Sequence, residues 1–156
     1  MWRMNKTRRI RRGRRWGAVL LEAVLVLPVL IYLALGMAEF GQYYHIRSSF
    51  EQAAVDAARL GIPATAQQGD PATAATQTLG YVGVTFNSSW LTITDYSNSN
   101  ATVTDVSQIA PGHMLIFKIQ TTYSQLPNAY RPLYGMTGIG VGSSKTVSGQ
   151  CSMVKE

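Results

Sequence analysis

Cysteine and histidine are scarce in this sequence of 156 residues. Cys151 is the single cysteine, which excludes an intramolecular disulfide and any zinc site built from several cysteines. The two histidines, His45 and His113, lie far apart in the sequence and belong to no catalytic or metal-binding motif. We therefore expect a protein that is not an enzyme and that holds no cofactor and no metal, with Cys151 serving as a small buried hydrophobic residue.

Acidic residues are absent before Glu22, whereas eight of the 14 Lys and Arg residues lie within the first 15 positions. The whole chain has a formal net charge of +6, but from Ala18 onward 6 basic residues face 8 acidic ones, a net charge of −2. A nucleic-acid-binding domain would carry its basic charge on the folded part. We therefore predict a basic leader, residues 1–17, before a mildly acidic body, and no nucleic-acid partner.

Polar residues are also nearly absent from residues 18–38, where Glu22 is the one charged residue. As a helix, these 21 residues span about 30 Å, the thickness of the hydrocarbon core of a bilayer. The basic residues before this segment favour an N-terminus on the cytoplasmic side. We predict a single pass through the cytoplasmic (inner) membrane, in contact with membrane lipid, with the rest of the chain outside.

Three interpretations compete for the N-terminal part. The apolar run is too long for an ordinary signal peptide, whose apolar region has about 7–15 residues. Residues 7–10 resemble the start of a twin-arginine signal, but Arg11 stands where such a signal has an apolar residue. The third is a segment that stays in the membrane, with or without removal of the leader. Glu22 favours it, since a carboxylate at the centre of a membrane helix costs about 2.5–3.5 kcal/mol and calls for a partner or an interface.

The sequence around Glu22 resembles a known processing motif. Residues 17–22 (GAVLLE) follow a basic leader and resemble the prepilin motif, with glycine before the cut and glutamate at mature position five. Pro28 follows six residues after Glu22, and residues 36–41 read G-x-x-E-F-G. Together these features are similar to the TadE-like minor pilins, or pseudopilins, of tight-adherence (Tad) pili. One departure is Ala23, where the family usually has an aromatic residue.

The resemblance implies a processed membrane protein. A membrane-embedded prepilin peptidase would cut between Gly17 and Ala18, and Gly17 would let the backbone enter the protease cleft. Glu22 would neutralise the N-terminal amine of Ala18, on the same chain or a neighbour; alternatively, it only reaches the lipid headgroups. The mature protein would be a structural and assembly pseudopilin of a Tad-type (type IVb) pilus or a related secretion apparatus.

The partners implied by the resemblance are the prepilin peptidase, other pilins or pseudopilins, and Tad assembly proteins. A minor pilin within the fibre is an alternative of the same class. A membrane-anchored extracytoplasmic binding module without a pilus role is the alternative from another class, and a small enzyme comes last.

Five further residues are candidate assembly or helix features. Pro28 would kink the membrane helix, either as a simple anchor or as a bend that suits packing among pilin helices. Gly36, Glu39, Phe40 and Gly41 mark the place where the helix leaves the membrane. The two glycines could let helices approach closely, although their spacing of five is not that of a G-x-x-x-G pair.

The helix is predicted to continue to residue 60 and to end at Gly61 and Pro63. Tyr43 and Tyr44 are typical of an aromatic belt at the outer interface. An apolar stripe at helical spacing predicts packing onto a sheet rather than a partner surface; its members are Ile46, Phe50, Ala53, Ala54, Ala57 and Ala58.

Residues 61–156 are predicted to form an extracytoplasmic α+β head. Asp70 is expected to cap a short helix over residues 72–79, with Pro71 at its first position and Gly80 after it. Alternating apolar residues predict strands that are one-sided, as in an antiparallel sheet with a helix on one face; these strands are 82–86, 91–93, 102–106, 113–123 and 146–153, with a turn at 98–100.

The overall prediction is a pilin-like fold, in which the long N-terminal helix packs on an antiparallel sheet of 3–4 strands. A long loop over residues 125–143 separates the last two predicted strands. Tyr130, Arg131 and Tyr134 could meet a partner there, although a loop that merely covers the head is the alternative with more weight.

Overall fold

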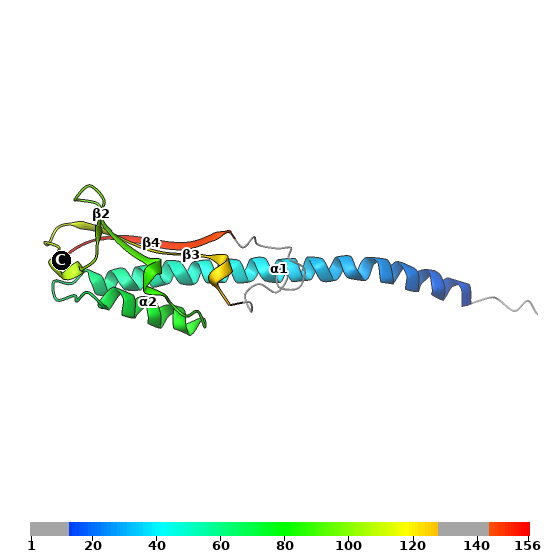
Figure 1. Cartoon of the computed structure of the whole chain (residues 1–156). Coiled ribbons are helices and arrows are strands. Elements are labelled where there is room, and N and C mark those ends of the chain that lie inside the picture. Colours follow the sequence, from blue (N-terminus) through cyan, green and yellow to red (C-terminus); the bar gives the residue numbers. More distant parts are fainter. Residues whose placement is uncertain (1–12, 128–143) are drawn as a thin grey trace, which may run out of the picture.

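A single helix runs through most of the length of the molecule (Figure 1). The computed structural model describes residues 13–127 and 144–156, with side chains from residue 17 onward. Helix α1, Gly13–Gly61, has 49 residues and contains Pro28, so it is about 73 Å long. The prediction of a helix over residues 18–60 placed the C-terminal end to within one residue, but the helix begins further upstream, at Gly13.

The second half of α1 forms the centre of the head, between α2 (Asp70–Tyr81) and the sheet (Figure 1). Its predicted apolar stripe is confirmed, because all six members from Ile46 to Ala58 are fully buried. Small side chains allow α1 to approach both layers closely, and Leu79 of α2 and Ile119 of the sheet pack into the same core as Phe50.

The sheet has four antiparallel strands in the order β2-β1-β3-β4, which confirms the predicted α+β fold. The strands are β1 (Leu91–Asp95), β2 (Ala101–Val103), β3 (Met114–Thr122) and β4 (Thr146–Val154). Phe117 of β3 lies opposite both Ile93 and Cys151 in the ladder, so it occupies the middle of the sheet. The inward residues of β3 are fully buried, as predicted; they are Leu115, Phe117 and Ile119.

Two glycines permit the closest contacts between the helix and the sheet. A Cβ on Gly149 would run into the backbone of Phe50 and Glu51, so β4 crosses α1 with no room for a side chain. A Cβ on Gly61 would come within 2.7 Å of the Phe117 ring. The alternation of residues along β4 predicts which face Gly149 occupies, but the need for glycine follows from the distance to the helix.

The predicted strand over residues 82–86 is wrong. Gly83, with φ of 72°, turns the chain sharply after α2, and the segment then crosses the core without a neighbouring strand. Val84 is buried, and Val82 and Phe86 are half-buried against the same core. The alternation of apolar residues was therefore real, but it reports one-sided packing of an extended connection rather than pairing in a sheet.

The boundaries of α2 also differ from the prediction. Gly69, not Asp70, occupies the N-cap position, and the helix continues through Gly80 to Tyr81. The Asp70 carboxylate instead accepts a hydrogen bond of 2.7 Å from the backbone N–H of Gln67, one turn before the helix. The aspartate thus holds the preceding turn rather than the first turn of α2.

Short 3₁₀ helices replace the ends of two predicted strands, and a third precedes β1. The predicted strand at 102–106 ends at Val103, and Val106 begins η2 (Val106–Gln108). Tyr123 leaves β3 for η3 (Tyr123–Gln125), although its side chain stays fully buried. Trp90 closes η1 (Ser88–Trp90) directly before β1. The predicted turn at 98–100 is confirmed, with Ser99 and Asn100 in the left-handed region at φ of 51° and 60°.

Candidate functional site

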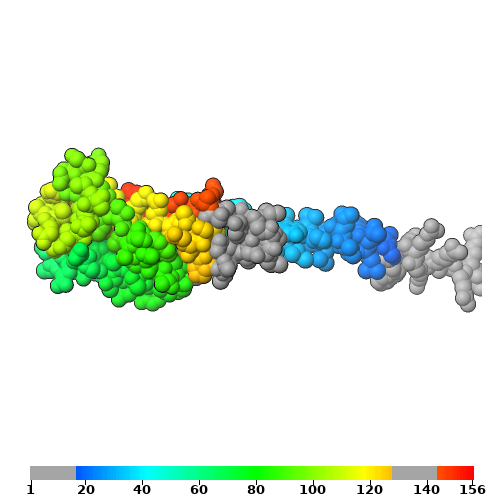
Figure 2. Space-filling view, in the orientation of Figure 1, coloured from blue at the N-terminus to red at the C-terminus, as the bar shows by residue number. Residues whose placement is uncertain are grey.

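The N-terminal half of α1 projects from the head as a narrow apolar rod (Figure 2). Every residue from 17 to 34 is exposed, including Leu21 at 73% and Leu25 at 71%. Within the described ranges, α1 is the one helix long and apolar enough to cross a membrane, with a mean hydropathy of 2.6 in its most apolar window. Exposed apolar surface on this scale is favourable only in lipid or against other apolar helices.

The predicted processing residues lie together at the start of this rod. Gly17, Ala18 and Glu22 are exposed and helical, and Glu22 lies about one and a half turns after Gly17. A Cβ on Gly17 would meet no atom of the described residues within 4 Å. The described part of the fold therefore does not require glycine at this position.

The segment 36–41 divides between two sides of α1. Phe40 follows Glu22 by 18 residues, five full turns, so both lie on one side of the helix. Phe40 is 59% exposed. Glu39 precedes Ile46 by seven residues, close to two turns, and shares the side of α1 that faces the head; it is only 1% exposed. Glu39 and Phe40 are thus neighbours in one motif, but Glu39 is buried on the side of the head and Phe40 is exposed.

The three remaining predicted features lie on the rod or at its end. Pro28 lies inside the continuous helix α1. Gly36 is half-buried and Gly41 is exposed, and a Cβ on either would meet no described atom within 4 Å. Both glycines leave space along the helix that the described part of the chain does not fill.

The two tyrosines after Gly41 have different environments. The ring of Tyr43 packs edge-on against Tyr123, with a centroid distance of 5.6 Å, and so belongs to the head. Tyr44 is 63% exposed and contacts Tyr43 at 5.7 Å. The ring of Tyr43 therefore covers the end of the core, whereas the interpretation of both residues as belt anchors stays a prediction.

The histidines lie in separate environments. His45 is exposed on α1. His113 lies at the start of β3, and its Nδ1 is 2.7 Å from the Oδ2 atom of the buried Asp95. No cluster of three metal-ligating side chains occurs in residues 13–127 and 144–156. Sequence reasoning missed the His113–Asp95 pair because the two residues come from different strands, 18 positions apart.

The pKa of Asp95 is lower than its ordinary value of 3.8. Burial raises this pKa, but the hydrogen bond and charge of His113, together with the backbone N–H groups of Ser97 and Asn98, lower it by more. The carboxylate also accepts a bond of 2.9 Å from Ser97 N–H, so it joins the turn after β1 to the start of β3.

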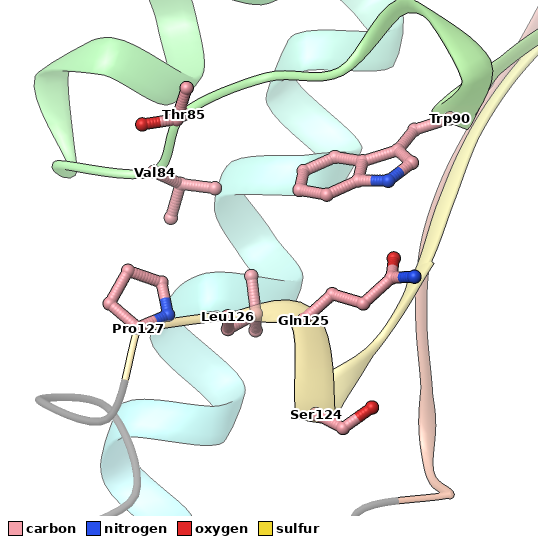
Figure 3. A pocket seen from close by; sticks show the side chains of 7 residues that line it. All are labelled: Val84, Thr85, Trp90, Ser124, Gln125, Leu126 and Pro127. Carbon is pink, nitrogen blue, oxygen red and sulfur yellow. The ribbon is translucent and has the colours of Figure 1, made fainter.

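One cavity of about 430 Å³ opens beside η1 and η3 (Figure 3). The Trp90 indole and the Gln125 amide face each other across it, and no charged side chain is among its described lining residues. Thr85 and Ser124 carry hydroxyls, but no histidine, lysine or carboxylate that could activate them is among the described lining residues; the lining comprises Val84, Thr85, Trp90, Ser124, Gln125, Leu126 and Pro127. Tyr130, Arg131 and Tyr134 of the predicted partner loop lie outside the described residues.

The model of the TadE-like protein family matches residues 17–59. The long helix of this chain is TadE-like. The match starts at Gly17 and ends two residues before the end of α1, so it covers the apolar rod and the helix of the head. The match links this helix to a family that is associated with Tad pilus systems. No curated protein and no solved structure matches this chain.

Proposed function

We propose that this chain is a membrane-anchored pseudopilin, a structural and assembly protein of a Tad-type pilus or a related secretion apparatus. The observation that carries the proposal is the coincidence of the TadE-like match with α1, in which residues 17–34 are all exposed and nearly all apolar. A helix of this kind needs lipid before assembly and apolar neighbours after it.

The charges support one orientation in the membrane. Eight basic residues precede residue 17, and the apolar window follows directly. Under the positive-inside rule, the leader 1–17 stays in the cytoplasm, residues 18–38 cross the inner membrane, and the head, 61–156, lies outside. The second half of α1 then carries the head away from the outer interface.

Processing is the second element of the proposal. A prepilin peptidase cuts between Gly17 and Ala18, where the exposed helix offers a backbone without a side chain. The new amine of Ala18 lies about one turn from Glu22 along the helix. Their opposite charges attract strongly in the low dielectric of the membrane, either within one chain or between neighbours during assembly.

The N-terminus of the protein recovered from membranes tests this proposal. We expect it to be Ala18 when the prepilin peptidase is present and Met1 when the peptidase gene is deleted. Gly17→Val should block processing, because a branched side chain then occupies the scissile position. Gly13→Val is the matched control, since Gly13 is also a helical leader glycine but lies four residues from the cut, and it should be processed normally.

An N-terminus at Met1 in both strains would overturn the processing step and would favour a membrane-anchored binding module, in which the basic leader only sets topology.

A further inference from the structure

In the part of the chain that the structure describes, strand β4 is a long edge strand without the usual protection. It lies at one end of the sheet order, and its nine residues pair with β3 in a continuous register. The strand TVSGQCSMV contains no charged residue and no proline. Edge strands of soluble proteins are normally blunted by lysine, proline or a bulge, so an unprotected edge of this length is open to pairing.

The ladder shows which backbone groups of β4 are open. Lys145 O accepts from Tyr123 N–H at 2.7 Å, and Lys155 N–H donates to His113 O at 2.8 Å. Odd-numbered residues of β4 therefore pair with β3. By the alternation of an antiparallel ladder, even-numbered residues direct their N–H and C=O groups away from β3; these are Thr146, Ser148, Gln150, Ser152 and Val154.

An open groove of about 550 Å³ lies along this edge, between β4 and α1. Its helix side carries the exposed ion pair of Arg47 and Glu51, with an N–O distance of 3.3 Å. Its strand side carries Ser148 and Gln150. The groove therefore offers open backbone groups on one wall and charged and polar side chains on the other, as a docking site for an extended segment requires.

The opposite edge of the same sheet is the three-residue strand β2, which also contains no charged residue and no proline. Tyr96 N–H donates to Met114 O, so even-numbered residues of β1 face β3 and odd-numbered ones face β2. In β2, the same alternation turns Thr102 outward, and Thr102 is exposed. The strand directions alternate across the four strands, so β2 runs antiparallel to β4.

We propose that β4 of one copy pairs with β2 of a second copy and so extends the sheet from subunit to subunit. The inference rests on the proposed assembly function. Because β2 and β4 run in opposite directions within one sheet, this contact keeps both α1 helices parallel and on the same side of the extended sheet. Pairing of β4 with another β4 in an antiparallel ladder would point the two membrane helices in opposite directions, which a shared membrane forbids.

Charge and residue size select one register. Placing Thr102 opposite Ser148 makes a hydrogen-bonded pair of two outward residues and puts Val103 opposite Val147, both on the face that α1 covers. The same register brings the acidic Asp105 to the basic Lys145 at the end of the contact. Within one copy, the Thr104 carbonyl oxygen accepts an exposed hydrogen bond of 3.3 Å from the Gln68 side-chain amide. In the proposed contact, this oxygen accepts a hydrogen bond from β4 of the other copy instead.

The register also implies a stagger between copies. Within one copy, Val103 of β2 lies opposite Ile93 of β1, and Phe117 of β3 lies opposite both Ile93 and Cys151 of β4. Val103 and Cys151 are therefore at the same level along the strands. Pairing with Val147 instead shifts the second copy by four residues, about 14 Å, along the strand. The shift is toward the membrane, because β4 begins at its membrane-proximal end. Such a contact is heterologous and does not close, so it can repeat along a fibre.

Cysteine cross-linking tests the contact in full-length protein, in cells that carry the assembly apparatus. Cys151→Ala removes the native thiol, and differently tagged Thr102→Cys and Ser148→Cys chains are co-expressed and oxidised. We expect a mixed disulfide dimer with a yield at least about tenfold above that of the pair Thr102→Cys with Ser152→Cys, whose partner site lies too far along β4 for a disulfide. Lys145→Glu should lower the yield, whereas Lys118→Glu, on the outer face of β3, should not.

Three results would overturn the inference: no mixed dimer, equal yields from the Ser148 and Ser152 pairs, or a dimer of Ser148→Cys chains alone. The same cells are scored for the N-terminus at Ala18 and for fibres. Normal processing and fibres without the mixed dimer would refute this contact and leave the proposed function intact. An unprocessed chain in cells without fibres would count against the proposed function itself.

Discussion

The Lys155 ammonium closes the C-terminal end of the long helix, where its Nζ donates to the carbonyl oxygen of Gly61 at 3.3 Å. The same Nζ donates to Pro63 O at 3.0 Å, and the Lys155 side chain is almost completely buried. Next to it, Glu156 N–H donates to Ile62 O at 3.2 Å. A cation at the negative end of a helix dipole is favourable, so the residues after β4 fix the end of α1.

Replacing this cation should destabilise the head. Lys155→Met removes both hydrogen bonds and the charge while keeping the apolar stem, so we expect a loss of about 1–3 kcal/mol in the free energy of unfolding. The measurement is chemical denaturation of the full chain in detergent micelles, followed by near-UV circular dichroism. Lys145→Met is the control, because the Lys145 side chain is exposed, and it should change stability little. An equal effect of both variants would contradict the helix-end role of Lys155.

Gly149 should tolerate no side chain. In Gly149→Ala the new Cβ meets the backbone of Phe50 and Glu51, so β4 and α1 must separate. We expect a loss of about 1–3 kcal/mol or more from this overpacking, seen as a lower thermal unfolding midpoint. Gly80→Ala is the same substitution in the exposed part of α2, where a Cβ meets nothing described, and it should stabilise by up to about 1 kcal/mol. An unchanged midpoint for Gly149→Ala would show that the two layers can move apart freely.

The head should lose stability in acid through Asp95. Because the pKa of Asp95 is lower in the folded state than its ordinary value of 3.8, the unfolded state binds the proton first. This contribution to stability is complete above pH 3.8 and is lost as the pH falls through the folded pKa. Denaturation curves of the full chain between pH 7 and pH 2 should show the loss in the wild type.

Asp95→Asn should be less stable at neutral pH and should show a smaller decrease in acid. Asp56→Asn is the control, because Asp56 is a half-exposed aspartate on α1. A wild-type decrease that Asp95→Asn leaves unchanged would assign the acid sensitivity to another carboxylate.

Glu22 should be needed for assembly and not for membrane insertion. Glu22→Leu makes the apolar rod more hydrophobic, so we expect normal amounts of protein in the membrane but no fibres in electron micrographs. Glu156→Leu is the control: it makes the same substitution at an exposed glutamate of the head, outside the groove between β4 and α1, and should leave fibres in place. Normal fibres in the Glu22→Leu strain would refute the assembly role.

Much of the fold follows from periodicity. The stripe from Ile46 to Ala58 repeats at helical spacing, and every member is buried. Alternation over residues 113–123 and 146–153 located β3 and β4, because each strand has one covered and one open face. The same alternation failed at residues 82–86, since periodicity reports burial and not a hydrogen-bonding neighbour.

The candidate site likewise has some features that local sequence patterns predict and others that only the packing of distant segments produces. The leader, the apolar segment, Gly17 and Glu22 were identified from the sequence because charge, hydropathy and a local motif are all carried by consecutive residues. The burial of Glu39 and the exposure of Phe40 were not identified from the sequence, because they depend on which side of α1 the head occupies. The Asp95–His113 pair and the Lys155–Gly61 contact likewise join residues that no local pattern connects.

The sequence alone determined the membrane-length helix, since local composition sets the preference of a helix for lipid, and it predicts the basic leader and the processing motif. It also determined the one-sided strands. Only the tertiary structure decided the strand order, the uncharged edge of β4 beside α1, and the requirement for glycine at position 149. Each of these depends on distances between segments far apart in the chain, and these distances arise only when the layers pack around one core.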